Sequence, residues 1–268
     1  MAVELDEDRK QRNHRVEADL IRTAAIALAV VPLVLTVLVG VVTRNVLIAL
    51  VVLLVVAGGL AAWAWTTVSG FGARLVTRPG CAPVTEQAQP RLHNLVDGLC
   101  VAHGVARPAL IGVAGPGRNI AAVTVGFGAS ATTALVVAEP LLDSLSRIEL
   151  EGVIAQQLSQ FQDGSSSLVT TAAAIGATPV LGSVLAGRLA AAAEPDRQVL
   201  ADLAGVRLTR YPPGLASALE TLAAGSTEIA VADPATAALW LADPLPSHPA
   251  GDDDPPSLEV RAAMLRER

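Results

Sequence analysis

The chain has 268 residues, of which 52% are hydrophobic and 16% are charged, and its mean hydropathy is +0.51. Because soluble domains carry about a quarter charged residues, part of this chain is expected to lie in lipid, and the rest is long enough for one domain with its own core. The formal net charge is −6, and no basic stripe with interleaved aromatic residues is present, which argues against nucleic-acid binding.

Residues 1–22 are highly charged and are predicted to lie in the cytoplasm, either as a helix beside the membrane or as a disordered tail. Residues 23–66 are predicted to form a transmembrane hairpin, with spans at 24–42 and 46–65. Each span has about 19 or 20 residues, which is enough to cross a hydrocarbon core of about 30 Å. The alternative of two buried helices in a soluble protein is disfavoured because neither stretch has a polar face.

The basic residues around the spans predict the orientation of the hairpin. Arg44 lies at the tip, whereas the opposite ends of the spans carry Arg9, Lys10, Arg12, Arg15, Arg22, Arg74 and Arg78. Because Lys and Arg are enriched in cytoplasmic loops, the tip is predicted to face outward. The N-terminus and the large C-terminal region are then expected to face the cytoplasm.

Residues 80–268 have the composition of an ordinary domain, which is predicted to be α+β and mainly helical. Apolar spacing and turn residues predict helices at 89–103, 140–145, 146–162, 197–209, 212–222 and 257–268, strands at 108–113, 121–126 and 134–138, and an extended tail at 244–256. Cys81 and Cys100 form no C-x-x-C pair and are interpreted as reduced structural residues.

The helix predicted at 146–162 has a sequence that resembles a known protein family. Residues 147–160 read R-I-E-L-E-G-V-I-A-Q-Q-L-S-Q. This run resembles the active-site helix of the HtpX-like integral-membrane zinc metallopeptidases, in which the last five positions read H-E-L-S-H. Further segments resemble the family in the same order, at 90–96, 104–108, 119–122, 136–142, 197–202, 208–210, 213–219, 248–249 and 256–261. The resemblance implies a zincin-like domain with a small β-sheet behind a two-helix anchor, in a multi-pass protein of the bacterial inner (cell) membrane.

The residues that the family uses for zinc chemistry are replaced here. In H-E-x-x-H the two His bind zinc, the Glu is the general base, and a distant Glu is the third ligand. The resemblance places Gln156, Gln160 and Gln198 at the ligand positions and Gln157 at the base position. A glutamine amide is a weak zinc ligand and cannot accept a proton near neutral pH. The expectation is therefore a degenerate zinc motif, no bound zinc and no peptidase activity, as in a pseudoprotease.

Glutamine has nearly the volume of glutamate, and its amide offers two donors and an acceptor oxygen. We therefore expect the four glutamines to form a hydrogen-bonded cluster with Asp202, which the resemblance identifies as the residue that orients a ligand. The alternative is a water-filled pocket in which the glutamines have no role.

Residues 167–190 form a third apolar stretch, which Pro179 interrupts. About 37 residues lie between Gln160 and Gln198, which is too few for two full spans and a turn. A single span would put the two halves of the site on opposite sides of the membrane. We expect a helical hairpin that packs on the domain or enters the membrane interface, and the alternative is a pair of short spanning helices.

The expected function is that of a scaffold, regulator or peptide-binding subunit. Extended segments would be captured by strand addition at Asn119, Ile120, Ala121 and Ala122. The expected partners are membrane lipid and a membrane-protein partner or client, without nucleic acid. Two alternatives remain. One is an active HtpX-like zinc metalloendopeptidase in membrane protein quality control, and the other is an accessory subunit of a larger membrane complex.

Overall fold

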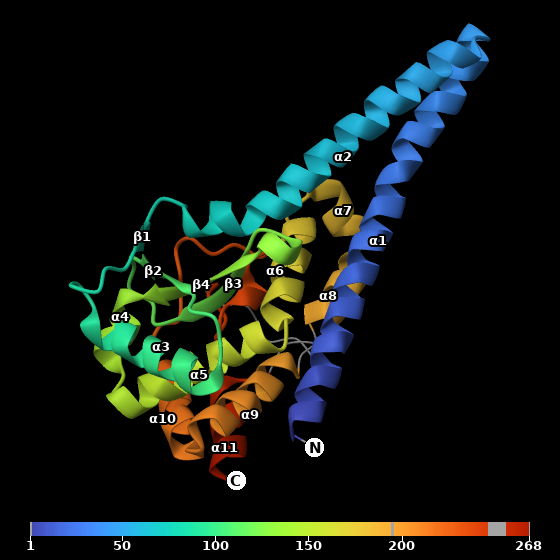
Figure 1. Ribbon diagram of the computed structural model, residues 1–268. Helices are drawn as coiled ribbons and strands as arrows, with labels where there is room; N and C mark the ends of the chain where they lie inside the picture. The colour runs from blue at the N-terminus through green and yellow to red at the C-terminus, as the bar shows by residue number, and fades with distance from the viewer. Residues whose placement is uncertain (1, 194–195, 246–255, 268) are drawn as a thin grey trace.

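The computed structural model describes residues 2–193, 196–245 and 256–267. Two long helices, α1 (Ala2–Thr43) and α2 (Val46–Val76), form an antiparallel pair that extends away from a domain of helices around a small sheet (Figure 1). Asn45 begins α2, because its side-chain oxygen accepts hydrogen bonds from the backbone N–H groups of Leu47 and Ile48 at 3.0 and 3.3 Å. This cap sets the tip of the hairpin at the predicted break.

Within the described residues, two helical segments, Glu7–Thr43 and Val46–Val76, are long and apolar enough to cross a membrane. Only 6% of the most apolar window of each segment is buried inside the protein. A contiguous exposed surface of Leu, Val and Ile is not stable against water. The structure therefore confirms the predicted fold class, a two-helix transmembrane hairpin followed by a mainly helical domain with a small mixed sheet.

The charged N-terminal segment is a helix continuous with α1, the first of the two predicted alternatives. Its polar side chains dock on the domain. Arg9 lies 3.1 Å from the carboxylate of Asp163, and the Asn13 amide donates to the Asp163 carbonyl at 2.8 Å. Glu17 accepts hydrogen bonds from Ser167 and Thr171, both at 2.8 Å. The same helix therefore contacts the domain at one end and forms the hairpin at the other.

In the described part of the chain, a four-stranded sheet has the order β1-β2-β4-β3. Its strands are β1 (Cys81–Pro83), β2 (Ala109–Val113), β3 (Ile120–Val125) and β4 (Thr132–Ala138). Strands β2 and β4 are parallel, and the other pairs are antiparallel. The three longer strands lie within two residues of their predicted positions. Strand β1 is too short to give a periodic signal in the sequence and is not predicted.

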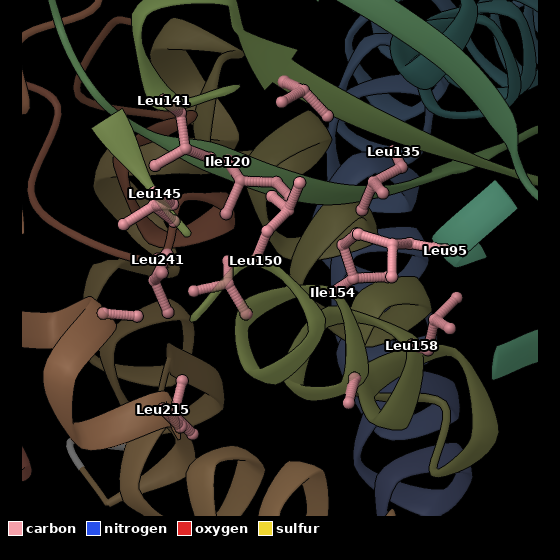
Figure 2. Packing of buried hydrophobic residues seen from close by; sticks show 14 of the residues in the cluster. Leu95, Ile120, Leu135, Leu141, Leu145, Leu150, Ile154, Leu158, Leu215 and Leu241 are labelled. Atoms are coloured by element: carbon pink, nitrogen blue, oxygen red, sulfur yellow. The ribbon is translucent and has the colours of Figure 1, made fainter. Parts of the chain in front are cut away.

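Helices cover both faces of this sheet. On one face lie α3 (Pro90–His103), α4 (Glu139–Ser144), α5 (Arg147–Gln162), α10 (Pro212–Ala223) and α11 (Leu258–Arg266). Figure 2 shows this core, in which Ile120 and Leu135 of the sheet lie near Ile154 and Leu158 of α5. Neighbouring strand residues point to the opposite face, where Ala121 and Val136 pack against the end of α2 and helix α6 (Ser165–Gly176).

Helix α5 has a well-defined start and a buried course. Ser146 caps it, because the Ser146 hydroxyl accepts from the Glu149 N–H and the Glu149 carboxylate accepts from the Ser146 N–H. Its residues from Gly152 to Gln160 are all buried. Helix α9 (Arg197–Thr209), which has the predicted bounds, packs along it.

The apolar stretch 167–190 folds into most of α6, then α7 (Pro179–Val184) and part of α8 (Ala186–Ala193). Helix α6 lies between the hairpin and the sheet, where Leu168, Ala172 and Ile175 pack against Leu20 and Ala24 of α1. At 1.5 Å per residue, the 12 residues of α6 reach about 18 Å, short of a hydrocarbon core of about 30 Å. The stretch therefore packs on the domain and the base of the hairpin. The extended tail predicted at 244–256 falls mostly on residues 246–255, outside the described residues.

Candidate functional site

The close approach of α5 and α9 builds the candidate site. A Cβ atom at Gly205 would lie 2.6 Å from the Cα and 2.7 Å from the backbone nitrogen of Gln156, so only glycine permits this contact. Gln198 lies about two turns before Gly205 on the same helix. The absence of a side chain at Gly205 thus brings Gln198 to the face of α5 that carries Gln156 and Gln160.

The structure brings together all four glutamines that the resemblance singles out. The exposed fractions of Gln156, Gln157, Gln160 and Gln198 are 0%, 0%, 1% and 4%. Gln156 and Gln160 are four residues apart, which places both on one side of α5. Four amides so deeply buried must bond to one another or to the backbone, since an unpaired buried polar group costs about 1–3 kcal/mol.

Gln156 is the centre of a hydrogen-bond network. Its amide nitrogen donates to Gln198 Oε1 at 3.1 Å. Its oxygen accepts from the amide nitrogens of Gln157 at 2.6 Å and Gln160 at 3.4 Å. The geometry is therefore that of the expected cluster and differs from a set of side chains turned toward solvent.

The network continues to residues beyond the glutamines. Gln198 donates to the carbonyl oxygen of Trp240 at 3.0 Å. Arg197 Nη1 donates to Gln160 Oε1 at 3.0 Å, and Arg197 Nη2 donates to the Ala238 carbonyl. Among the described residues, Gln157 Oε1 is the buried amide oxygen of the cluster without a hydrogen-bond partner. The network thus joins α5, α9 and the segment around Trp240.

Asp202 forms a buried ion pair beside this network. Arg261 Nε and Nη2 each donate to a different carboxylate oxygen of Asp202 at 2.7 Å, and both side chains are 2% exposed. Burial raises the pKa of Asp202, while the Arg261 charge and a hydrogen bond from Gln156 act against this rise. Arg261 also donates to the Leu241 carbonyl at 2.8 Å. Asp202 therefore links α9 to α11 and lies within hydrogen-bonding reach of the cluster.

Of the predicted peptide-binding residues, Asn119 directly precedes β3 and the other three lie on it, at the edge of the sheet, but other parts of the chain occupy that edge. Ala121 pairs with Trp240, and the Leu241 N–H donates to the Ile120 carbonyl at 2.9 Å. The Asn119 amide donates to the Ala242 carbonyl at 2.9 Å, and the Ser166 hydroxyl donates to the Ala122 carbonyl at 3.0 Å. A peptide could add to this strand only after the segment 240–242 moved, so peptide capture here stays a prediction.

Two arginines, Arg197 and Arg261, are part of the site and are not assigned a role by the sequence. Each lies in a segment that resembles the family, at the start of α9 and in α11. Their partners are 37 and 59 residues away in the chain, so no local spacing indicates the contacts. A buried arginine requires a partner, but the sequence does not show which arginines are buried.

Zinc, the ion that the resemblance implies, does not fit the residues at this site. The amide nitrogens carry hydrogens and have no available lone pair, and the oxygens of Gln156, Gln160 and Gln198 already accept hydrogen bonds. Zinc is bound by Cys, His, Asp and Glu. In the described ranges, no three residues of these types come together as a possible metal site. No chemical step through zinc follows from this geometry.

Comparison with known proteins finds relatives named Protease HtpX homolog, among them the following three. The Dictyoglomus turgidum protein is 32% identical over 222 residues, which cover 70% of this chain and 72% of that protein. The Dictyoglomus thermophilum protein is 32% identical over 62% of this chain and 65% of its own length. The Pyrococcus abyssi protein is 30% identical over 60% and 66%. The aligned region thus spans 65–72% of these relatives. No family model and no solved structure matches the chain.

These relatives correct one expectation. The prediction that the chain is not an enzyme is wrong, because the related proteins are named proteases and so point to an enzyme. The four glutamines misled the prediction, because they replace three zinc ligands and the general base while the rest of the chain keeps its resemblance to the family. The recognised relationship itself is confirmed: the chain is a membrane protein with two apolar helices, and it belongs to the HtpX-like family of membrane metallopeptidases.

Proposed function

We propose that this chain is a membrane-anchored peptidase that acts on polypeptides at the membrane surface. The observation that supports this proposal is the 32% identity over 222 residues with the Dictyoglomus turgidum protein, whose name states that it is a protease. Its place would be the inner membrane of a bacterium, with both spans crossing and the domain in the cytoplasm. Membrane proteins with exposed or unfolded segments are the class of substrate that such an anchor favours, in keeping with a role in quality control.

The docking of α1 on the domain supports a substrate near the membrane. Arg9, Asn13 and Glu17 hold the first part of α1 against the region around Asp163, the residue after the last residue of α5. The candidate site on α5 is thus tied to the helix that enters the bilayer. Gln157 stands at the base position, and an amide cannot take up a proton near neutral pH. No proton transfer is therefore assigned to it.

Cleavage by the purified chain tests the proposal. The full chain would be purified in detergent and incubated with an unfolded reporter and with a membrane protein that has an unfolded cytoplasmic segment. Gln157→Ala removes a buried amide of the candidate site and its hydrogen bond to Gln156, so we expect fragments whose formation is lost in this variant. Cleavage should be retained in Gln162→Ala, a change at an exposed position of the same helix. Intact substrates with the native chain, or equal cleavage by both variants, would contradict a peptidase site on α5.

A second candidate function is the binding of polypeptide as a scaffold, a regulator or a subunit of a membrane complex. The amide network supports this candidate, because the buried glutamines hold α5, α9 and the segment at Trp240 in fixed positions relative to one another. Purification in mild detergent with reversible cross-linking would separate these roles. A fixed stoichiometric partner indicates a subunit, and a changing set of membrane-protein clients indicates a scaffold or regulator. If neither is captured, this candidate fails without affecting the cleavage test.

A further inference from the structure

We infer that the glutamine network takes the structural place of the metal ion, so that this site is held together without zinc. The inference concerns the metal and does not rest on the proposed peptidase function. A metal ion with ligands on α5 and α9 cross-links the two helices. Here the bond from Gln156 to Gln198 makes that cross-link directly, at 3.1 Å. The bond from Gln198 to Trp240 extends it to the segment that pairs with β3.

The direction of the hydrogen bonds leaves few oxygen lone pairs for a cation to bind. A carbonyl oxygen has two lone pairs, and Gln156 Oε1 accepts from both Gln157 and Gln160. Gln198 Oε1 accepts from Gln156, and Gln160 Oε1 accepts from Arg197. The atoms that would have to face an ion at the three ligand positions are therefore already engaged with hydrogens.

The charge of Arg197 is a further obstacle to a cation. This side chain is 6% exposed, and its Nη1 lies 3.0 Å from Gln160 Oε1. A guanidinium keeps its charge in proteins, and repulsion between like charges is stronger in a buried site than in water. A divalent ion beside Gln160 would therefore meet a fixed positive charge as well as neutral ligands. The network accommodates that charge because Gln160 turns its oxygen toward the arginine.

Metal content and thermal stability test the inference without any substrate. The full chain would be expressed with ample zinc and purified in detergent. Zinc per chain would be measured by elemental mass spectrometry, and melting would be followed with and without a chelator. We expect far less than one zinc per chain and the same melting temperature in both conditions. Near-stoichiometric zinc, together with a melting temperature that the chelator lowers, would overturn the inference.

A revertant is the matched comparison. It carries Gln156→His, Gln157→Glu, Gln160→His and Gln198→Glu. We expect this variant to bind about one zinc per chain and to melt at a lower temperature when the metal is removed. A revertant that folds and binds no zinc would overturn the assignment of these residues to the metal positions.

If the revertant does not fold, single variants of the native chain still decide. Gln156→Ala removes the centre of the network, whereas Gln162→Ala removes an exposed glutamine that donates to the His103 carbonyl from the same helix. We expect Gln156→Ala alone to lower the melting temperature clearly, by the same amount with and without chelator. Equal melting temperatures for the two variants would show that the network does not hold the site. Because none of these readouts requires cleavage, they are independent of the outcome for peptidase activity.

Discussion

At the scale of single residues, burial distinguishes two ion pairs that have almost the same geometry. Arg261 pairs with Asp202, and Arg266 pairs with Glu220, each through two N–H groups at 2.7 Å. Both arginines lie on α11. The side chains of the first pair are 2% exposed, and those of the second are 49% and 47% exposed. A comparison of the two pairs therefore isolates the effect of burial on the stability that an ion pair contributes.

We predict that Arg261→Ala lowers the free energy of unfolding of the domain by about 3–5 kcal/mol, because it leaves the Asp202 carboxylate buried without its partner. Arg266→Ala is the control and should have a small effect, because water replaces the lost partner of an exposed carboxylate. Urea unfolding in detergent, followed by tryptophan fluorescence, measures both. Similar losses for the two variants would contradict a special role for the buried pair.

Asp163 gives a prediction for pH dependence. Burial raises its pKa from 3.8, against the opposing effect of Arg9 and of hydrogen bonds from Ser165. Since the folded state binds this proton more tightly than the unfolded state does, the contribution of Asp163 to stability is complete below pH 3.8 and is lost as pH rises through the raised pKa. The stability of the native chain relative to Asp163→Asn should therefore fall as pH rises across this range. Melting curves of both proteins in matched buffers measure the difference, and a constant difference would contradict the raised pKa.

The residues of the site show how far the sequence could be interpreted. The order of motifs identifies four residues of the site even though their chemistry has changed, and the structure brings them together: Gln156, Gln157, Gln160 and Gln198. The roles of Arg197, Arg261 and the carbonyl of Trp240 could not be predicted. Contacts of this kind depend on how distant helices pack, and one sequence contains no pattern that encodes them.

At the scale of elements, the packing of α5 on α9 depends on Gly205. We predict that Gly205→Ala lowers the free energy of unfolding by about 1–3 kcal/mol, because its Cβ would lie 2.6 Å from the Cα of Gln156 and push the helices apart. Gly98→Ala on α3 is the matched control, since no atom lies within 4 Å of its added Cβ. This control should raise stability by about 0.5–1 kcal/mol, the usual gain for alanine over glycine inside a helix. Denaturant unfolding of both variants distinguishes a steric effect, with opposite signs, from a general response to alanine.

The elements themselves were predictable where capping and periodicity agree. Helix α3 ends at His103 because Gly104 adopts φ 65, and α9 has the predicted bounds. The docking of residues 7–17 on the domain could not be foreseen, because acidic and basic side chains are mixed there and no apolar stripe indicates a buried face. Its contacts are polar, as in the bonds of Glu17 with Ser167 and Thr171.

At the scale of the whole molecule, α1 connects the domain to the tip of the hairpin in one continuous helix (Figure 1). Arg9 contacts Asp163 in the domain, and Thr43 lies at the far end of the same helix. The chain then returns along α2 directly into the sheet at β1. The N-terminal segment and the domain must therefore lie on the same side of a membrane that both helices cross, whichever side that is.

The basic residues decide between the two possible sides. Arg44 is at the tip, whereas Arg74 and Arg78 follow the second span, so the tip is predicted to face outward and the domain the cytoplasm. In a background carrying Cys81→Ser and Cys100→Ser, Thr43→Cys should react with a membrane-impermeant maleimide on intact cells. Glu86→Cys, at an exposed position of the domain, should react only after permeabilisation. The reverse labelling pattern would show the opposite orientation in the membrane, with the α5 site outside the cytoplasm. Labelling of both positions on intact cells would contradict the separation of tip and domain by the membrane, because the length and apolar surface of α1 and α2 require that separation.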